Sequence, residues 1–418
     1  MGLQPRISYA PAICRSESTG SRWPPWPILR PRTGACGRKA LVGRLSRDRD
    51  ISGYPRFAQN LDPLAWSKVS MKAARMHTTG GPGVFKYEDV PQPKPRQGEF
   101  LIEVHCAGVN PVDTKIRKGK YKPFRPRLPA IIGRDVAGVV RGVGGKARKG
   151  RRSAFRVGDP VFGMLDYDRG AYSEYTIASA REIAFRPKNV SERDAGAIGV
   201  AALTAWQGLF DHGRLKKGQR VLIHGAAGGV GHFAVQFARI SGATVIATAS
   251  KRDLDWVKGL GADEVIDFKN QRFEEHTGNI DLVLDLIAGD TQDRSWGVLK
   301  TSGGAIVSTL TEPSKAVARK HHARGMRMVV KVKTAQLRKI ASLIGSGRVK
   351  VTVAKVFPLR RVTEAHRCLE NDHVRGKVEL HIAPTWTDLA ARMSENGGTP
   401  SQLAVYAGTG LSGLGPML

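Results

Sequence analysis

The pattern of hydrophobic and polar positions along the chain changes near Ser191. Before it, from MKAARM at Met71 to about residue 190, short apolar or alternating segments are separated by Pro and Gly turns, which is typical of β-strands. After it, helical stretches alternate with short apolar runs, and Ser191 itself stands where a helix N-cap is expected. Six runs in this second region are predicted strands: VLIH, TVIATAS, EVIDF, DLVLDLI, GGAIVSTL and MRMVVKV. Strands joined by helices in this order predict a doubly wound parallel sheet.

The last part of the chain returns to the first pattern. Residues 351–383 read as strand, helix and strand, and we expect them to complete the β-rich region. The sequence thus predicts an α/β protein, with a β-rich domain from residues 71–190 and 351–383 and a dinucleotide-binding domain from residues 191–350. The flanking segments lack a sustained period, which favours a disordered or targeting extension at 1–70 and a flexible tail at 384–418.

A glycine-rich turn lies at the start of the predicted parallel sheet. The run GQRVLIHGAAGGVGHFAVQFAR, residues 218–239, has a buried-strand pattern, then glycines, then a helical pattern. Glycines let the backbone approach a pyrophosphate, whose charge is held by free N–H groups at the helix N-terminus. His224 within the run is interpreted as a packing residue. We expect a dinucleotide cofactor to bind against Gly225, Gly228, Gly229, Val230 and Gly231.

The residues that follow TVIATAS, the predicted strand after the glycine-rich run, indicate which dinucleotide binds. Sites for NAD usually place Asp or Glu there to hold the ribose 2′-hydroxyl. TVIATAS ends instead in Ser250, Lys251 and Arg252, and the first acid is Asp253. A hydroxyl followed by two cations suits a 2′-phosphate, which a carboxylate would repel. The alternative is that both cations are solvated residues opening the next helix, but cations oppose the helix dipole there. We therefore predict NADPH.

The composition narrows the class of protein. The chain has 418 residues and no apolar run near the ~20 that cross a bilayer, so we expect a soluble protein. Its four cysteines lie far apart, which argues against a disulfide framework and fits a reducing compartment. The net charge of +31 would attract nucleic acid or acidic partners, but no nucleic-acid-binding motif accompanies it. We interpret the charge as a solvated surface, including the basic run at 146–152, which is expected in an exposed hairpin loop.

From Met71 to about Ile382 the motifs resemble those of the medium-chain dehydrogenase/reductases, in the zinc-independent quinone oxidoreductase (zeta-crystallin-like) branch. The matching segments, in order, are GVNPVDTKIRKGKY, GRDVAGVV, GAYSEY, LTAW, GQRVLIHGAAGGVGHFAVQFAR, LGADEVIDF and RGKV. The resemblance implies a GroES-like catalytic domain plus a Rossmann domain, with the active site in the cleft between them.

Zinc alcohol dehydrogenases of the same superfamily hold their metal with a Cys, a His and usually a nearby Glu. By resemblance these positions carry Asn110, Arg134 and Asp135 here. Asn and Arg are not useful ligands for Zn²⁺. His105 and Cys106 are adjacent, but consecutive strand residues face opposite ways and cannot converge on one ion. We therefore expect no bound metal.

Hydride addition to a carbonyl compound puts negative charge on its oxygen, so a hydrogen-bond donor is needed near it. Asn110 and Tyr121 have the spacing of related mitochondrial-type enoyl reductases, and this resemblance makes Tyr121 a candidate general acid and Asn110 a positioning group beside the nicotinamide. The alternative for Tyr121 is an ordinary loop aromatic, because a quinol product can take protons from water. Thr204, in LTAW, would by resemblance face the nicotinamide end of the cofactor. Asp113 is expected to fix its loop through backbone hydrogen bonds.

The leading hypothesis is an enzyme, an NADPH-dependent oxidoreductase that transfers a hydride to quinones or α,β-unsaturated carbonyls. One alternative is a zinc-free alcohol or aldehyde reductase, which would lack the strongest polariser of a simple carbonyl. The other is a non-catalytic NADPH-binding protein with nucleic-acid affinity. A homodimer could form through the edge of the parallel sheet, with MRMVVKV (326–332) as the candidate strand. The predicted compartment is the cytoplasm, or a mitochondrion or plastid if residues 1–70 are a transit peptide.

Overall fold

The structure is a computed structural model in which residues 70–145 and 153–382 are described. Both ranges belong to one compact unit of the chain. The predictions made for the N-terminal extension, for the basic loop at 146–152 and for the C-terminal tail fall outside the described residues. Within the described ranges, no helix is both long and apolar enough to cross a membrane.

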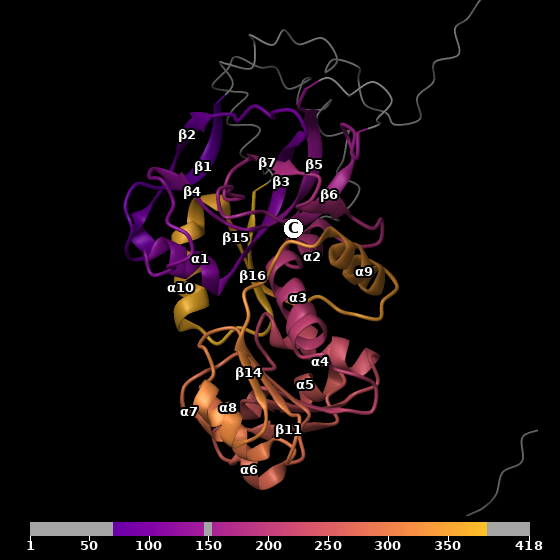
Figure 1. The fold of residues 1–418 in the computed structure, drawn as a ribbon. Coiled ribbons are helices and arrows are strands. Elements are labelled where there is room, and N and C mark those ends of the chain that lie inside the picture. The colour runs from indigo at the N-terminus through magenta and orange to yellow at the C-terminus, as the bar shows by residue number, and fades with distance from the viewer. Residues whose placement is uncertain (1–69, 146–152, 383–418) are drawn as a thin grey trace, which may run out of the picture. The chain divides into compact units, whose positions relative to one another are not determined.

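Six parallel strands form one sheet. In chain order they are β9 (Arg220–Ile223), β10 (Thr244–Ala249), β11 (Glu264–Asp267), β12 (Leu282–Asp285), β13 (Ala305–Ser308) and β14 (Arg324–Arg327). Their spatial order is β11-β10-β9-β12-β13-β14, so the chain changes direction across the sheet between β9 and β12. Figure 1 labels the two edge strands of this sheet, β11 and β14. Ligands of such sheets bind in the crevice at the carboxyl ends of the strands, at this switch point. The predicted doubly wound parallel sheet is confirmed.

The predicted bounds of the sixth strand, MRMVVKV at 326–332, are wrong. β14 ends at Arg327, and the residues that follow it up to Lys333 have no regular secondary structure. The Gln207 side chain binds both backbone groups of Lys331: its Oε1 accepts from the N–H at 3.0 Å, and its Nε2 donates to the carbonyl at 2.8 Å. Several of the apolar side chains in this segment pack against the main core, so the segment does not continue the edge strand.

A second, seven-stranded sheet contains strands from both ends of the described chain. Its order is β15 (Val353–Pro358), β16 (Lys377–His381), β3 (Glu99–Val109), β5 (Asp135–Val143), β6 (Pro160–Met164) and β8 (Ile183–Phe185), with β7 (Tyr175–Ser179) also paired to β3. A smaller sheet has the order β2 (Phe85–Pro91), β1 (Ser70–Met76) and β4 (Ala130–Ile131). β16 runs antiparallel to β3, with Val378 opposite Val109. The late strand β16 therefore lies beside the strand that leads into Asn110.

Helices connect these strands. The helices are α1 (Pro111–Arg117), α2 (Glu192–Gly196), α3 (Gly199–Trp206), α4 (Gly231–Ile240), α5 (Leu254–Gly259), α6 (Phe273–His276), α7 (Asp290–Ser295), α8 (Lys315–Lys320), α9 (Thr334–Gly345) and α10 (Val362–Asn371). Short 3₁₀ turns lie at η3 (Pro82–Val84), η5 (Lys251–Asp253), η6 (Trp296–Val298) and η7 (Leu359–Arg361), and a π-helical turn, η4 (Gln207–His212), follows α3. Ser191 is the N-cap of α2, as predicted, because its side-chain oxygen accepts the Asp194 N–H at 3.0 Å.

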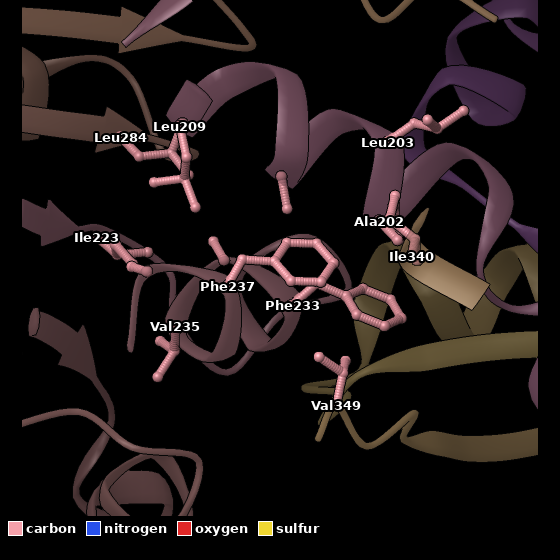
Figure 2. Close-up of a cluster of buried hydrophobic side chains, with 14 of the residues drawn as sticks. Ala202, Leu203, Leu209, Ile223, Phe233, Val235, Phe237, Leu284, Ile340 and Val349 are labelled. Atoms are coloured by element: carbon pink, nitrogen blue, oxygen red, sulfur yellow. The ribbon is translucent and has the colours of Figure 1, made fainter. Parts of the chain in front are cut away.

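Two aromatic side chains on α4 anchor the main core. Phe233 and Phe237 are at most 1% exposed, and their ring centroids lie 6.0 Å apart. Figure 2 shows them among side chains from α3, β9, β12 and α9, including Ile223 and Leu284. Burial of each such side chain stabilises the fold by about 1.5–3 kcal/mol. This packing fixes α4 and α3, the helices that carry the glycine turn and Thr204.

Candidate active site

A cavity of about 520 Å³ lies where the crevice of the parallel sheet meets the seven-stranded sheet. One wall comes from the glycine turn and the strand ends of the parallel sheet, and the other from α1 and from residues around Tyr121 and Tyr167. The volume is within the usual range for small-molecule and cofactor sites, about 300–1,000 Å³. Every predicted site residue lines this cavity except Lys251 and Arg252.

The glycine turn exposes bare backbone to the cavity. Gly225 has a φ of +71°, in the left-handed region that favours glycine. A Cβ on Gly231, the first residue of α4, would lie only 2.2 Å from the Gly225 carbonyl oxygen. An anionic pyrophosphate needs this close approach to backbone at a helix N-terminus. All five predicted residues of the turn line the cavity: Gly225, Gly228, Gly229, Val230 and Gly231.

Of the three residues predicted to hold a 2′-phosphate, only the first reaches the cavity. Ser250 is buried, lines the cavity, and donates its hydroxyl to Asp253 Oδ2 at 2.5 Å. Lys251 and Arg252 are exposed and lie in the turn that follows β10. Their contact with a phosphate stays a prediction.

Asp253 joins this turn to the late RGKV motif, a contact that the sequence analysis missed. It is fully buried and accepts from His373 Nε2 and from Arg375 Nε, each at 2.5 Å. Burial opposes its charge, but hydrogen bonds from Ser250, Arg375 and His373 hold the pKa of Asp253 below its ordinary value. The RGKV motif, which contains Arg375, was the only feature of the sequence that could have pointed to this contact. The motif does not indicate which residue Arg375 binds.

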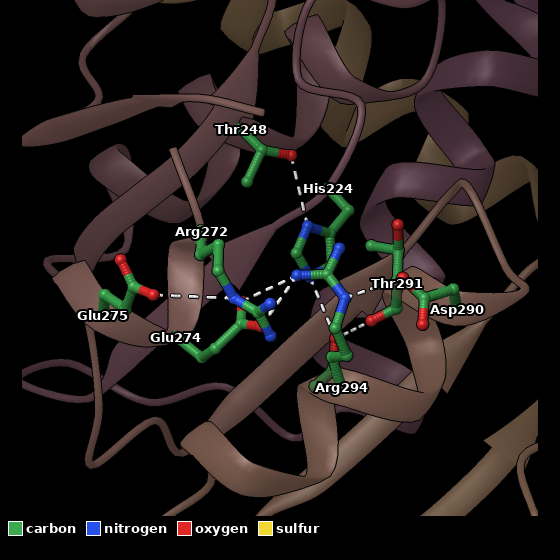
Figure 3. A network of polar contacts seen from close by, with 9 residues as sticks. His224, Thr248, Arg272, Glu274, Glu275, Asp290, Thr291 and Arg294 are labelled. Carbon is green, nitrogen blue, oxygen red and sulfur yellow. Dashed lines mark hydrogen bonds and ion pairs between the residues drawn. The ribbon is translucent and has the colours of Figure 1, made fainter. Parts of the chain in front are cut away.

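His224 lies directly after β9, beneath the glycine turn. Its Nδ1 lies 3.1 Å from Thr248 Oγ1 and its Nε2 lies 3.0 Å from Ser295 Oγ. Burial lowers the pKa of His224 to about 4, so the ring is neutral near pH 7. Figure 3 shows the ring beside the ion pair of Arg294 with Glu274, at 2.8 Å. Both ring nitrogens are used in these contacts, and His224 also lines the cavity, so its role as a packing residue stays a prediction.

Asn110 is the N-cap of α1 and lines the cavity. Its N–H donates to Asp113 Oδ2 at 2.8 Å, which confirms that Asp113 fixes this loop. The Asn110 side chain is 2% exposed, and its Nδ2 donates to Asp135 Oδ2 at 3.0 Å. Burial, with the negative charge of Asp135 nearby, raises the pKa of Asp113 to about 6.

A buried lysine that the sequence analysis did not single out completes this cluster. Lys377, the first residue of β16, is 2% exposed. Its Nζ donates to Asn110 Oδ1 and, at 3.0 Å, to Asp135 Oδ2. Asp135 is fully buried, and its Oδ1 accepts the Val200 N–H of α3 at 2.5 Å. The lysine stem also lies against the glycine turn, since a Cβ on Gly229 would meet Lys377 Cδ at 3.1 Å. One side chain thus joins Asn110, the seven-stranded sheet and the glycine turn.

Tyr121 is 7% exposed and its hydroxyl lies 2.7 Å from that of Tyr167, a partner not predicted from the sequence. Two phenols in contact carry two O–H groups, of which their mutual bond uses one. The Arg134 guanidinium lies 3.8 Å from the centroid of the Tyr167 ring. Burial raises the pKa of Tyr167, although the charge of Arg134 opposes this shift. Because the mutual contact uses one of the two O–H groups, the other is available to a ligand.

Thr204 lines the cavity from α3. Its Oγ1 donates to the Val200 carbonyl at 2.6 Å, so its proton is already used. The oxygen can still accept a hydrogen bond. Thr204 is therefore suited to a ligand group that carries an N–H, such as a carboxamide.

The donor set at the cavity does not fit a zinc ion. Among the described residues, no group of three or more His, Cys, Asp or Glu side chains is placed to hold a metal. At the positions compared with zinc ligands, Asn110 supplies an amide, Arg134 a cation, and Asp135 is already paired with Lys377. Zinc prefers thiolate, imidazole and carboxylate ligands.

Two family models match the chain. Residues 96–188 match the alcohol dehydrogenase GroES-like domain, and residues 260–379 match the zinc-binding dehydrogenase family. The second description names a metal, but the described residues contain no group of three or more His, Cys, Asp or Glu side chains placed to hold one.

Individual proteins match over most of their length. A chloroplastic quinone-oxidoreductase homolog of Spinacia oleracea is 32% identical over 317 residues, covering 72% of this chain and 94% of that protein. A chloroplastic NADPH-dependent alkenal/one oxidoreductase of Arabidopsis thaliana is 32% identical over 381 residues, covering 88% and 94%. The solved structure of the quinone oxidoreductase from Coxiella burnetii superposes with a TM-score of 0.69 at 33% identity, covering 75% of this chain and 100% of that one.

Proposed function

Because the chain belongs to the medium-chain dehydrogenase/reductase superfamily, among its quinone oxidoreductases, we propose that it is an NADPH-dependent reductase of quinones and α,β-unsaturated carbonyls. The observation that carries the proposal is the single cavity that joins the glycine turn to Asn110 and to the Tyr121–Tyr167 pair. A cofactor bound along one wall and an acceptor bound against the other would meet in it.

The chain's own residues hold the cofactor and leave the redox chemistry to it. When bound, NADPH supplies the hydride. The glycine turn and the N-terminus of α4 bind the pyrophosphate. The Thr204 oxygen accepts from the carboxamide at the nicotinamide end. Asn110, held from both sides by Asp135 and Lys377, forms a rigid wall that sets the position of the ring.

The Tyr121–Tyr167 pair serves the substrate oxygen. Negative charge grows on that oxygen as the hydride arrives, and the free O–H of the pair stabilises it and donates its proton. Tyr121 donates its proton to the substrate oxygen, Tyr167 replaces it along the short contact, and the half-buried Tyr167 phenolate then takes a proton from water. The Arg134 cation lies against the Tyr167 ring and stabilises the phenolate that Tyr167 becomes after it gives up its proton.

The preference for NADPH rests on charge at the end of β10. Lys251 and Arg252 are exposed beside the buried Ser250, where a ribose of the cofactor would leave the cavity. Two cations there would bind a 2′-phosphate by charge-assisted hydrogen bonds. Asp253 does not oppose the phosphate, because its charge is balanced by Arg375.

We also propose the domain bounds, the oligomeric state and the compartment of the protein. The proposed division, into a GroES-like domain (71–190 and 351–383) and a Rossmann domain (191–350), is supported by the place of β15 and β16 in the seven-stranded sheet. A homodimer would pair the outer edge of β14, the last strand of the parallel sheet, and sedimentation of the full chain tests it. Cytoplasmic location is proposed over a mitochondrion or plastid, and N-terminal sequencing of the native protein tests the choice.

Steady-state kinetics on the full chain test the function. The protein is mixed with NADPH or NADH and with a benzoquinone, an enone or a simple aldehyde, and the absorbance of the reduced nicotinamide is followed. We expect turnover of the quinone and the enone, faster with NADPH than with NADH. Turnover of aldehydes alone would favour the alcohol or aldehyde reductase. No turnover, with salt-sensitive nucleic-acid binding, would favour the non-catalytic alternative.

A further inference from the structure

The charges that line the cavity are unevenly distributed along the parallel sheet. In a doubly wound sheet the first strands, here β9 to β11, bind the adenosine half of the cofactor, so the nicotinamide and the substrate lie toward β13 and β14. On that side the lining includes Lys115, Arg134 and Arg327. Asp372 is the acidic side chain found in the lining within the described ranges, and it is paired with Lys355 at 2.7 Å. The substrate side therefore has an excess of positive charge.

Two of these cations approach the cavity from opposite walls. Lys115 belongs to α1, and Arg327 is the last residue of β14. Neither side chain has a hydrogen bond or ion pair to any described residue, whereas another cation of the lining, Arg294, is held by Glu274 and Asp290. Burial, with the charge of Arg327 nearby, lowers the pKa of Lys115. Two like charges near one another, without an anion, favour a ligand that supplies one.

The third cation, Arg134, is more deeply buried than Lys115 and Arg327. Arg134 is 2% exposed, and its Nη1 is buried without a hydrogen-bond partner among the described residues. A buried guanidinium nitrogen left unpaired is costly, because its desolvation is not compensated. An anionic or strongly polarised oxygen in the cavity would reduce that cost.

The phosphates of the cofactor do not account for Lys115 and Arg327. The pyrophosphate belongs at the glycine turn, and a 2′-phosphate belongs beyond β10, on the other side of the switch point from β14. The remaining ligand is the substrate.

We propose that the substrate carries an anionic substituent, a carboxylate, sulfonate or phosphate beside its reducible quinone or enone, and that Lys115 and Arg327 bind it. This inference rests on the proposed reductase function and narrows its substrate class. Both residues are specificity-determining, because they contact the substituent and not the reacting atoms. A cation pair of this kind also attracts anionic substrates from solution, an effect that salt screens.

The test compares matched substrates that differ in charge. The first pair is 1,2-naphthoquinone-4-sulfonate and 1,2-naphthoquinone, and the second is a 4-oxo-2-enoic acid and its methyl ester, so that sulfonate and carboxylate are tested separately. The readout is the ratio of kcat/KM for the anionic to the neutral member. We expect a ratio well above one for the native chain, falling by on the order of tenfold in Lys115→Gln/Arg327→Gln, because the amides cannot donate charge-assisted hydrogen bonds to the anion.

Lys120→Gln is the matched control, since this neighbouring lysine is exposed and lies outside the cavity lining. It should keep the native ratio. Far-UV circular dichroism and thermal melting check that the double variant is folded. A ratio that does not change in the double variant overturns the inference. An equal rise of the NADPH KM with both members also overturns it, since the cations would then bind the cofactor. If no quinone or enone is reduced by the native chain, the proposed function itself has failed.

Discussion

Replacing Lys377 with Met tests whether the buried ammonium holds the two walls of the cavity together. The change keeps an unbranched side chain that matches the lysine stem as far as Cε, and removes the charged nitrogen. It leaves the fully buried Asp135 carboxylate without its ion pair and Asn110 Oδ1 without its donor. Loss of one partner of a buried ion pair costs about 3–5 kcal/mol. Since whole domains are stable by about 5–15 kcal/mol, this is a large fraction of the total.

A double-mutant cycle separates the ion pair from simple loss of packing. In Lys377→Met/Asp135→Asn the buried charge is gone, and the Asn110 amide can turn so that its Oδ1 accepts from the new amide. We therefore expect the double variant to lose less free energy of unfolding than the sum of the two single changes, by about 0.5–3 kcal/mol.

The assay is denaturant unfolding, with NADPH affinity from fluorescence titration measured alongside. Lys377→Met should weaken NADPH binding, because Lys377 lies against Gly229. Lys355→Met is the matched control from the neighbouring strand: its pair with Asp372 has the similar length of 2.7 Å but is exposed. An exposed pair contributes little to stability, because water and salt screen its charges. The reasoning is refuted if the losses of unfolding free energy in the two single variants simply add up in the double variant. It is also refuted if Lys377→Met and Lys355→Met lose the same unfolding free energy.

Three further changes give distinct outcomes. Lys251→Ala/Arg252→Ala should narrow the NADPH preference over NADH by on the order of tenfold in kcat/KM, and an unchanged preference removes the 2′-phosphate assignment. Tyr121→Phe should lower kcat on enones more than on quinones, because a quinol can take protons from water, and equal effects in the same absorbance assay would remove Tyr121 from proton transfer. Burial raises the pKa of Glu379 from 4.5 to about 8, so the native chain loses stability as pH rises through this window. Glu379→Gln should therefore gain roughly 3 kcal/mol over the native chain between pH 5 and pH 8 in denaturant unfolding, while the exposed Glu264→Gln shows no such trend.

The edge strand of the parallel sheet shows a limit of sequence reasoning. MRMVVKV has the composition of a strand, but after Arg327 the Gln207 side chain binds the backbone of Lys331, and several apolar side chains of the segment pack against the main core. Gln207 lies 124 residues before Lys331, so no local window contains both. Tertiary contacts override intrinsic strand preference at such positions.

The sequence by itself determined the parallel sheet, the glycine turn and the loop that carries Asn110. Each depends on residues close in the chain: apolar runs, glycines at fixed spacing, and an N-cap with Asp113 three residues on. Local backbone sterics and hydrogen bonds act over such distances, so the pattern is readable without the fold.

Only the tertiary structure decided what these pieces touch. Lys377 reaches Asn110 across 267 residues, Tyr167 reaches Tyr121 across 46, and Arg375 reaches Asp253 across 122. Such contacts depend on which strands become neighbours, here β16 beside β3, and no spacing in the chain encodes that choice. Burial decides the rest, because an ammonium or a carboxylate becomes energetically decisive only when the folded chain removes it from water.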